Sequence, residues 1–132
     1  MPTPNHILLL LVLASYSICT LAIGEQDAQP AIVHITSGLP KEPGPMDVIC
    51  KFDGYNLGVH TLFPGDDYQW SATEKGIYYC QATWVNKFVA WHGYEPLRDA
   101  SHGTIFWLAK ADGIFLSYDK SNYVKVADWE TD

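Results

Sequence analysis

The chain has 132 residues, of which 48% are hydrophobic, 14% aromatic and 17% charged. Eight Lys and Arg residues oppose fifteen Asp and Glu residues, which gives a formal net charge of −7 at pH 7. This composition is typical of one folded domain and argues against disorder. Binding to nucleic acid or to anionic lipid depends on basic side chains. We therefore expect no nucleic-acid partner and no affinity for a charged membrane surface.

The N-terminal segment, residues 1–22, has the pattern of a secretory signal peptide. Its apolar core, Ile7–Leu13, is shorter than the roughly 20 apolar residues of a transmembrane helix. We expect cleavage after Ala22, with Gly24 as the alternative, and a flexible polar tail over residues 23–30. The first six residues contain no Lys or Arg, so a buried amphipathic helix or an uncleaved anchor is the competing interpretation. No second apolar stretch of spanning length follows, so we expect a secreted, extracellular chain with no membrane insertion after cleavage.

The three cysteines predict one disulfide bond. Cys19 lies in the segment that is removed, which leaves Cys50 and Cys80 as an even pair in an oxidising compartment. A bond between them closes a loop of about 31 residues and stabilises the fold by about 3.5 kcal/mol in the chain-entropy model. Two buried free thiols are the alternative.

Residues 31–132 are expected to form a single all-β domain. Short segments with alternating or β-branched apolar residues recur about every ten residues, each closed by Gly, Pro, Asn or Asp. We expect eight or nine short strands, over 31–36, 46–52, 57–62, 68–70, 77–83, 87–91, 104–109, 114–118 and 123–127. The pattern predicts an antiparallel β-sandwich, in which Gly93–Gly103 is the longest loop.

The sequence contains no arrangement typical of an enzyme, a cofactor site or a metal site. A nucleophile elbow, a P-loop and a dinucleotide-binding motif are absent, and four histidines are scattered through the mature chain. We therefore expect no catalysis, no cofactor and no metal. Asp66 and Asp67, in a Pro-Gly turn, could ligate calcium, but turn carboxylates more commonly cap backbone N–H groups. A hydrolase whose carboxylates converge only on folding is the least favoured alternative.

The five tryptophans can serve either as core residues or as surfaces on which sugars stack. We expect Trp70 and Trp107 in the core, because a strand pattern flanks each of them. Trp84 and Trp91 are the candidates for an exposed stacking surface. A small extracellular glycan-binding module is therefore the alternative function.

A run from Leu57 to Trp70 reads Leu-Gly-x-His-x-Leu-x-x-Gly-x-x-Tyr-x-Trp, and Cys50 precedes it by seven residues. Further matching segments follow the same order and spacing: His34–Leu39, Ile77–Cys80, Asp112–Phe115 and Trp129. Together these segments resemble the plant self-incompatibility stigma-protein family, also called S-protein homologues, over about residues 31–130.

The chain also departs from the pattern of that family. Ser37 stands where the family usually has Asn, and the stretch over residues 72–76 is shorter. A second cysteine pair, usual shortly before the tryptophan equivalent to Trp107, is absent. The loss of both members supports the pairing of Cys50 with Cys80. It also predicts that the loop Gly93–Gly103 is less constrained.

The resemblance implies a secreted, non-enzymatic β-sandwich whose best-known members are stigma ligands read by a receptor on the pollen surface. The expected partner is thus an extracellular or membrane-receptor protein, with a glycan as the alternative. Loops on a rigid scaffold carry partner-facing groups, and an acidic surface speeds encounter with a basic partner. The candidate loops span 40–45, 53–56, 72–76, 93–103 and 119–122. Their candidate partner-facing residues are Lys41, Glu42, Asp53, Tyr55, Asn56, Glu74, Lys75, Glu95, Arg98, Asp99, His102, Asp119 and Lys120.

Overall fold

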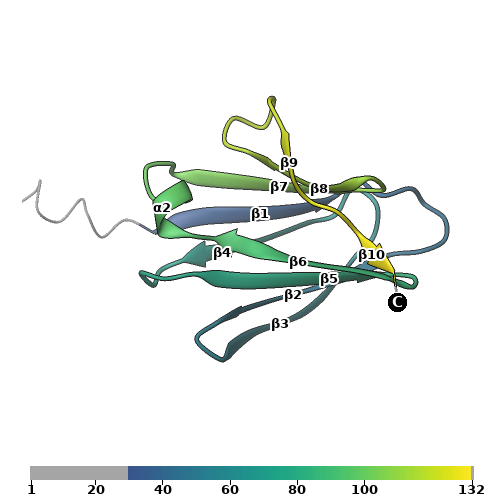
Figure 1. Ribbon diagram of the computed structural model, residues 1–132, viewed down its shortest axis with the longest axis horizontal. Coiled ribbons are helices and arrows are strands. Elements are labelled where there is room, and N and C mark those ends of the chain that lie inside the picture. The colour runs from purple at the N-terminus through teal and green to yellow at the C-terminus, as the bar shows by residue number, and fades with distance from the viewer. Residues whose placement is uncertain (1–29, 132) are drawn as a thin grey trace, which may run out of the picture.

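Residues 30–131, the part of the chain that this computed structural model describes, form two five-stranded β-sheets that pack face to face (Figure 1). The strands are β1 (Ala31–Ser37), β2 (Met46–Phe52), β3 (Tyr55–Leu62), β4 (Asp67–Ala72), β5 (Tyr78–Trp84), β6 (Lys87–Tyr94), β7 (Thr104–Lys110), β8 (Gly113–Ser117), β9 (Val124–Ala127) and β10 (Glu130–Thr131). One sheet has the order β4-β1-β7-β8-β9 and the other β10-β6-β5-β2-β3. The predicted all-β sandwich is confirmed. The predicted signal peptide, residues 1–22, lies outside the described residues, as does the predicted tail before residue 30.

Each of the nine predicted segments forms a strand, and in β1, β5 and β7 every second side chain is buried between the sheets, whereas the edge strand β9 is mostly exposed. In β1 the side chains of Val33 and Ile35 are fully buried, while those of Ile32 and His34 are partly exposed. The sequence did not predict β10, which pairs with the start of β6. Two residues are too few to show a period.

One pair of strands departs from the predicted antiparallel arrangement. β1 and β7 are parallel, whereas every other pair among residues 30–131 is antiparallel. These two strands lie far apart in the sequence, and the chain between them passes through the second sheet, which permits parallel pairing. The alternation of apolar side chains is the same for either direction, so the sequence pattern carried no information on this point.

The segment predicted as the longest loop is partly structured. β6 continues to Tyr94, and one helical turn, α2 (Pro96–Asp99), follows. Pro96 suits the first helical position, because the N–H that proline lacks has no partner within the helix there. Among residues 30–131, no helix is long and apolar enough to cross a membrane.

Four tryptophans occupy or border the space between the sheets. Trp107 is 1% exposed, and its indole N–H donates to the carbonyl oxygen of Gly93 at 2.9 Å. Trp70 packs half-buried against the core. Trp84 and Trp91 are 6% and 5% exposed, so the prediction that they form an exposed stacking surface is wrong. Both occupy inward-facing positions of the alternating strands β5 and β6.

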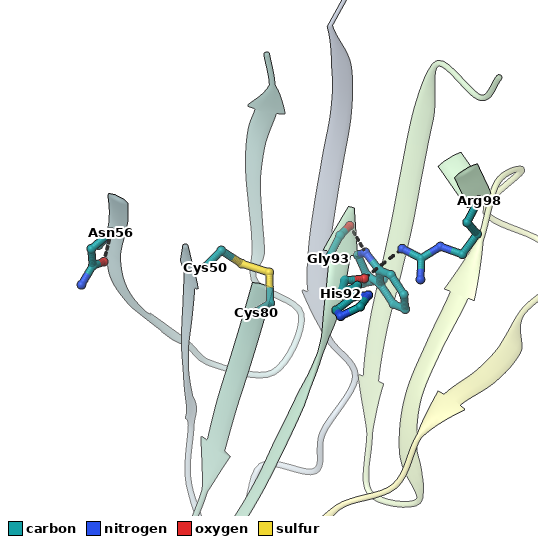
Figure 2. The surroundings of a disulfide bond; sticks show 8 residues. Cys50, Asn56, Cys80, His92, Gly93 and Arg98 are labelled. Atoms are coloured by element: carbon teal, nitrogen blue, oxygen red, sulfur yellow. Dashed lines mark hydrogen bonds between the residues drawn. A yellow bond between two sulfur atoms is a disulfide. The ribbon is translucent and has the colours of Figure 1, made fainter. Parts of the chain in front are cut away.

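The disulfide bond joins Cys50 and Cys80, which lie directly opposite each other on β2 and β5 (Figure 2). Both cysteines are buried in the core. Gly93 on β6 lies against this bond, and a β-carbon at that position would overlap the sulfur atom of Cys80 and contact Trp70. The absence of a side chain at residue 93 lets the disulfide bond pack directly against β6.

Candidate recognition surface

Four of the five predicted loops lie at one end of the sandwich; three of them are on the left in Figure 1, and the β8–β9 loop is drawn toward the top. At this end the even-numbered strands β2, β4, β6 and β8 finish, and the strands that follow them begin. The connections β2–β3, β4–β5, β6–β7 and β8–β9 are therefore gathered together. We call this the loop end.

The fifth predicted loop, over residues 40–45, joins β1 to β2 at the opposite end of the sandwich. Its two candidate residues, Lys41 and Glu42, are exposed there. They are separated from the other candidates by the length of the strands. The structure therefore divides the predicted set into one large group and one distant pair.

A pocket with a volume of about 410 Å³ opens at the loop end, between the β2–β3 turn and the β4–β5 connection. Three of the predicted residues line this pocket: Asp53, Tyr55 and Glu74. Asn56 lies beside it, and its side-chain oxygen accepts the backbone N–H of Gly58 at 2.6 Å (Figure 2). The lining is completed by Phe52, Leu57, Thr73 and Tyr78. We call this the loop-end pocket.

The first wall of the loop-end pocket is a tight hairpin turn. Asp53 and Gly54 have positive φ angles of 49° and 78°, and Phe52 pairs with Tyr55 across them. This is the two-residue connection with both central residues at positive φ, which favours Asp-Gly. The turn places Asp53 and the 75% exposed ring of Tyr55 at the rim.

The second wall is held by contacts between the β4–β5 connection and the aromatic rings behind it. The backbone N–H of Glu74 donates to the hydroxyl oxygen of Tyr78 at 3.2 Å. The rings of Phe52 and Tyr78 lie 4.8 Å apart. A β-carbon at Gly76 would lie only 2.6 Å from the ring of Phe52, so the connection packs closely on that ring. Both walls are thereby tied to the sheet. Lys75 is exposed next to Glu74 and does not line the pocket.

The α2 segment, at the same end of the sandwich, is organised around a buried carboxylate. The Asp99 side chain is fully buried and accepts from Arg98 Nε at 2.7 Å, Arg98 Nη2 at 2.6 Å, the Tyr118 hydroxyl at 2.6 Å and the Glu95 backbone N–H at 2.9 Å. Asp99 therefore does not face a partner, and that prediction is wrong. The reason is that its neighbours Glu95 and Arg98 supply three donors and Tyr118, which follows β8, supplies the fourth.

The other predicted residues of this segment, Arg98, Glu95 and His102, make contacts around the buried Asp99 carboxylate and its partner Tyr118. Arg98 also donates to the carbonyl oxygen of His92 at 2.8 Å (Figure 2), and its guanidinium carbon lies 5.0 Å from the ring centre of Trp107. Glu95 pairs with Arg98 at 3.3 Å, and the ring of His102 stacks on that of Tyr118. The segment Gly93–Gly103, predicted to be less constrained without a second disulfide, is held by this ion pair and its hydrogen bonds.

Burial and the cluster also change the acidity of Tyr118. Desolvation, with the hydrogen bond to Asp99 and the charge of Asp99, raises the pKa of the Tyr118 hydroxyl to about 12. The neutral hydroxyl is thus favoured in the folded protein, where it donates to the carboxylate.

The β8–β9 loop carries the last two predicted residues, Asp119 and Lys120, both exposed. The Asp119 carboxylate accepts from the backbone N–H and the side-chain amide of Asn122 and from the backbone N–H of Ser121. These hydrogen bonds hold the pKa of Asp119 well below its ordinary value. The carboxylate therefore orders its own loop.

The turn carboxylates considered as calcium ligands bind protein donors. Asp66 accepts the backbone N–H of Phe63 at 3.0 Å, and Asp67 accepts from Thr36 and contacts His34, both at 2.8 Å. Within the part of the chain that the structure describes, no group of three or more His, Cys, Asp or Glu side chains is arranged to hold a metal ion.

Sequence reasoning missed several residues of this surface. Leu97 on α2 is fully exposed. Its position as a lone leucine inside a polar segment could have identified it from the sequence as a surface residue. Phe52 and Tyr78 line the loop-end pocket but belong to strands, so a search restricted to loops passed over them.

The fold and this surface define a small, disulfide-bonded β-sandwich with four of its connections gathered at one end. Residues 32–129 match the family described as plant self-incompatibility protein S1, and the chain belongs to that family. The resemblance read from the sequence is therefore confirmed.

A solved structure of a self-incompatibility protein homologue has a similar fold, with a TM-score of 0.63 and 16% sequence identity over 79% of this chain and 97% of that one. It is described as representing a widespread family of small, highly stable, secreted proteins from plants. Secretion is also the localisation that the sequence of this chain predicts. No curated protein matches the chain.

Proposed function

We propose that this protein is a secreted, non-enzymatic recognition ligand that a cell-surface receptor binds through the loop end. One observation carries the proposal: the strand order brings four of the five candidate loops together on a sandwich tied by a buried disulfide bond. Membership of the self-incompatibility family supports a role in extracellular recognition.

Two large apolar side chains at the loop end are well suited to contact a receptor. The Tyr55 side chain is 75% exposed and that of Leu97 is fully exposed, on different connections of the same end. Tyrosine is among the residues that contribute most of the binding energy at the centre of an interface, and an exposed leucine adds apolar area that binding removes from water. The net charge of −7 favours fast encounter with a basic receptor surface.

The tryptophans first assigned to a glycan-binding site are not accessible to a sugar. Trp84 and Trp91 are buried in the core and cannot stack on a sugar without unfolding. A protein receptor is therefore the partner that we favour, and a glycan becomes an outcome of the experiment.

The test compares equivalent substitutions at the two ends of the sandwich. Labelled secreted protein is bound to plasma-membrane vesicles from pollen and, for comparison, from leaf. We expect saturable binding that Tyr55→Ala and Leu97→Ala each weaken by about tenfold or more. Phe63→Ala is the matched control, because Phe63 is 57% exposed in the turn after β3, at the opposite end. It should change binding less than about twofold.

Other outcomes would contradict the proposal. Equal weakening by Phe63→Ala would show that the loop end is not the contact surface, and the absence of saturable binding would argue against a membrane receptor. Binding that survives protease treatment of the vesicles but not glycosidase treatment would favour the glycan alternative. An association rate unaffected by salt would exclude electrostatic steering.

A further inference from the structure

The loop-end pocket combines aromatic walls with two carboxylates. Phe52, Tyr55 and Tyr78 supply the rings, and Asp53 and Glu74 supply the carboxylates from two different connections. These connections, β2–β3 and β4–β5, lie at the same end of the molecule in Figure 1. The aromatic rings and the charges therefore come from separate parts of the chain and meet only in the folded protein.

The negative charge of this pocket is not neutralised by the protein itself. Among residues 30–131, five ion pairs form, and none of them includes Asp53 or Glu74. No Lys, Arg or His lines the pocket. Two other carboxylates at this end, Glu95 and Asp99, already pair with Arg98. Asp53 and Glu74 thus remain available to a cation from outside.

We propose that the loop-end pocket binds a Lys or Arg side chain of the partner protein, an inference that rests on the proposed function for the nature of the partner. A cation held near aromatic rings is attracted by the negative charge of their faces. Carboxylates at the rim add hydrogen-bonded ion pairs, which are bidentate with a guanidinium. Two carboxylates in the lining disfavour an anionic ligand for the same electrostatic reason.

The size and rigidity of the pocket fit such a side chain. Its volume of about 410 Å³ lies within the usual range for small-ligand sites and accommodates a long side chain with some flanking backbone. The tight Asp53-Gly54 turn and the packing of Gly76 on Phe52 hold both walls in place. A preorganised pocket loses little conformational entropy on binding.

The pocket offers a neutral sugar few uncharged polar groups for orientation. Neutral sugars are oriented by several hydrogen-bond donors and acceptors beside a stacked ring. Here the neutral polar side-chain groups of the lining are three hydroxyls, those of Tyr55, Thr73 and Tyr78, and that of Tyr78 already accepts from the backbone N–H of Glu74. The balance of aromatic rings and uncompensated carboxylates favours a cation.

The experiment titrates the secreted, disulfide-bonded protein with two short peptides, followed by the backbone amide signals in nuclear magnetic resonance. One peptide is N-acetyl-Gly-Arg-Gly-amide, and the other has citrulline, the neutral analogue of arginine, in place of Arg. We expect shifts over residues 52–57 and 73–78. The arginine peptide should bind about tenfold more tightly than the citrulline peptide, which corresponds to about 1.4 kcal/mol.

A pair of double variants with the same change in net charge tests the two carboxylates. Asp53→Asn with Glu74→Gln should reduce the affinity for the arginine peptide about tenfold. Asp53→Asn retains an Asn-Gly turn, which the hairpin also favours, so the fold is kept. The control, Glu42→Gln with Asp112→Asn, removes two carboxylates at the opposite end and should leave the affinity unchanged.

Three results would overturn the inference: equal binding of the two peptides, shifts confined to other parts of the chain, or shifts at this pocket only with an oligosaccharide. Failure of the proposed function is a separate result. Arginine-peptide binding in the pocket without any binding to vesicles would leave the cation site standing and remove the membrane receptor. If the Asp53→Asn, Glu74→Gln protein binds vesicles as well as the unchanged protein does, the membrane receptor stands and the cation site is not the surface that it contacts.

Discussion

Replacing Asp99 with Asn tests whether the buried ion pair with Arg98 fixes the α2 segment, a role that a second disulfide bond could otherwise fill. The Asp99 carboxylate is 0% exposed and accepts four hydrogen bonds, three of them from the side chains of Arg98 and Tyr118. Breaking one partner out of a buried ion pair costs about 3–5 kcal/mol. An asparagine amide would also direct donors at groups that already donate.

The position of Arg98 sets the expected magnitude at the lower end of that range. Its side chain is 23% exposed, so water can partly solvate the guanidinium once Asp99 is lost. We expect Asp99→Asn to lower the free energy of unfolding by about 3 kcal/mol. With an unfolding entropy of about 2.1 cal/mol/K per residue over roughly 100 residues, this lowers Tm by about 14 °C.

The assay is thermal and urea unfolding of the oxidised protein, followed by circular dichroism. Asp112→Asn is the matched control, because Asp112 lies exposed in the β7–β8 turn and should change stability by less than about 0.5 kcal/mol. Combining Asp99→Asn with Arg98→Gln should cost less than the sum of the single changes. A Tm for Asp99→Asn within about 2 °C of the control would refute the reasoning.

Three further predictions follow from the core, the cluster and the N-terminal segment. Gly93→Ala should lower stability by about 1–3 kcal/mol, because its methyl group overlaps the Cys80 sulfur, and an unchanged urea midpoint would contradict that packing. Because the pKa of Tyr118 is raised from 10.0 to about 12, stability should fall as pH rises through this window. Tyr118→Phe, which also loses the hydrogen bond to Asp99, should show a smaller fall in urea unfolding over the same pH range, and an identical fall would argue against this assignment. The intact mass of the secreted protein should correspond to cleavage after Ala22, and treatment with an alkylating agent should add no mass to either cysteine. A mass equal to that of the full-length chain would contradict the predicted signal peptide.

Much of the fold could be predicted because it depends on local patterns. Alternating apolar residues indicate a strand without knowledge of its neighbours, so all nine expected segments form strands. The Asp53-Gly54 turn is likewise specified locally, since this dipeptide favours positive φ at both residues. Once Cys19 was assigned to the predicted signal peptide, Cys50 and Cys80 remained as the pair.

Other features depended on residues that meet only after folding. The sequence pattern did not reveal that β1 and β7 run parallel, because alternation is the same in both directions. Trp84 and Trp91 were misplaced because their burial depends on which face of β5 and β6 packs against the other sheet. Asp99 was misplaced because its burial was not apparent from the sequence: Glu95 and Arg98 are close to it in the chain, but Tyr118, its fourth donor, is brought to it only by folding.

The scaffold follows from local sequence patterns, whereas the recognition surface depends on contacts that form only on folding. The sequence by itself determined an all-β, disulfide-bonded domain and the loops that could carry recognition, because strand periodicity, turn residues and cysteine number are local properties. Only the tertiary structure decided that four of those loops share one end and that two of them enclose an aromatic, acidic pocket. Strand order and register set these distances, and both arise from packing between distant segments.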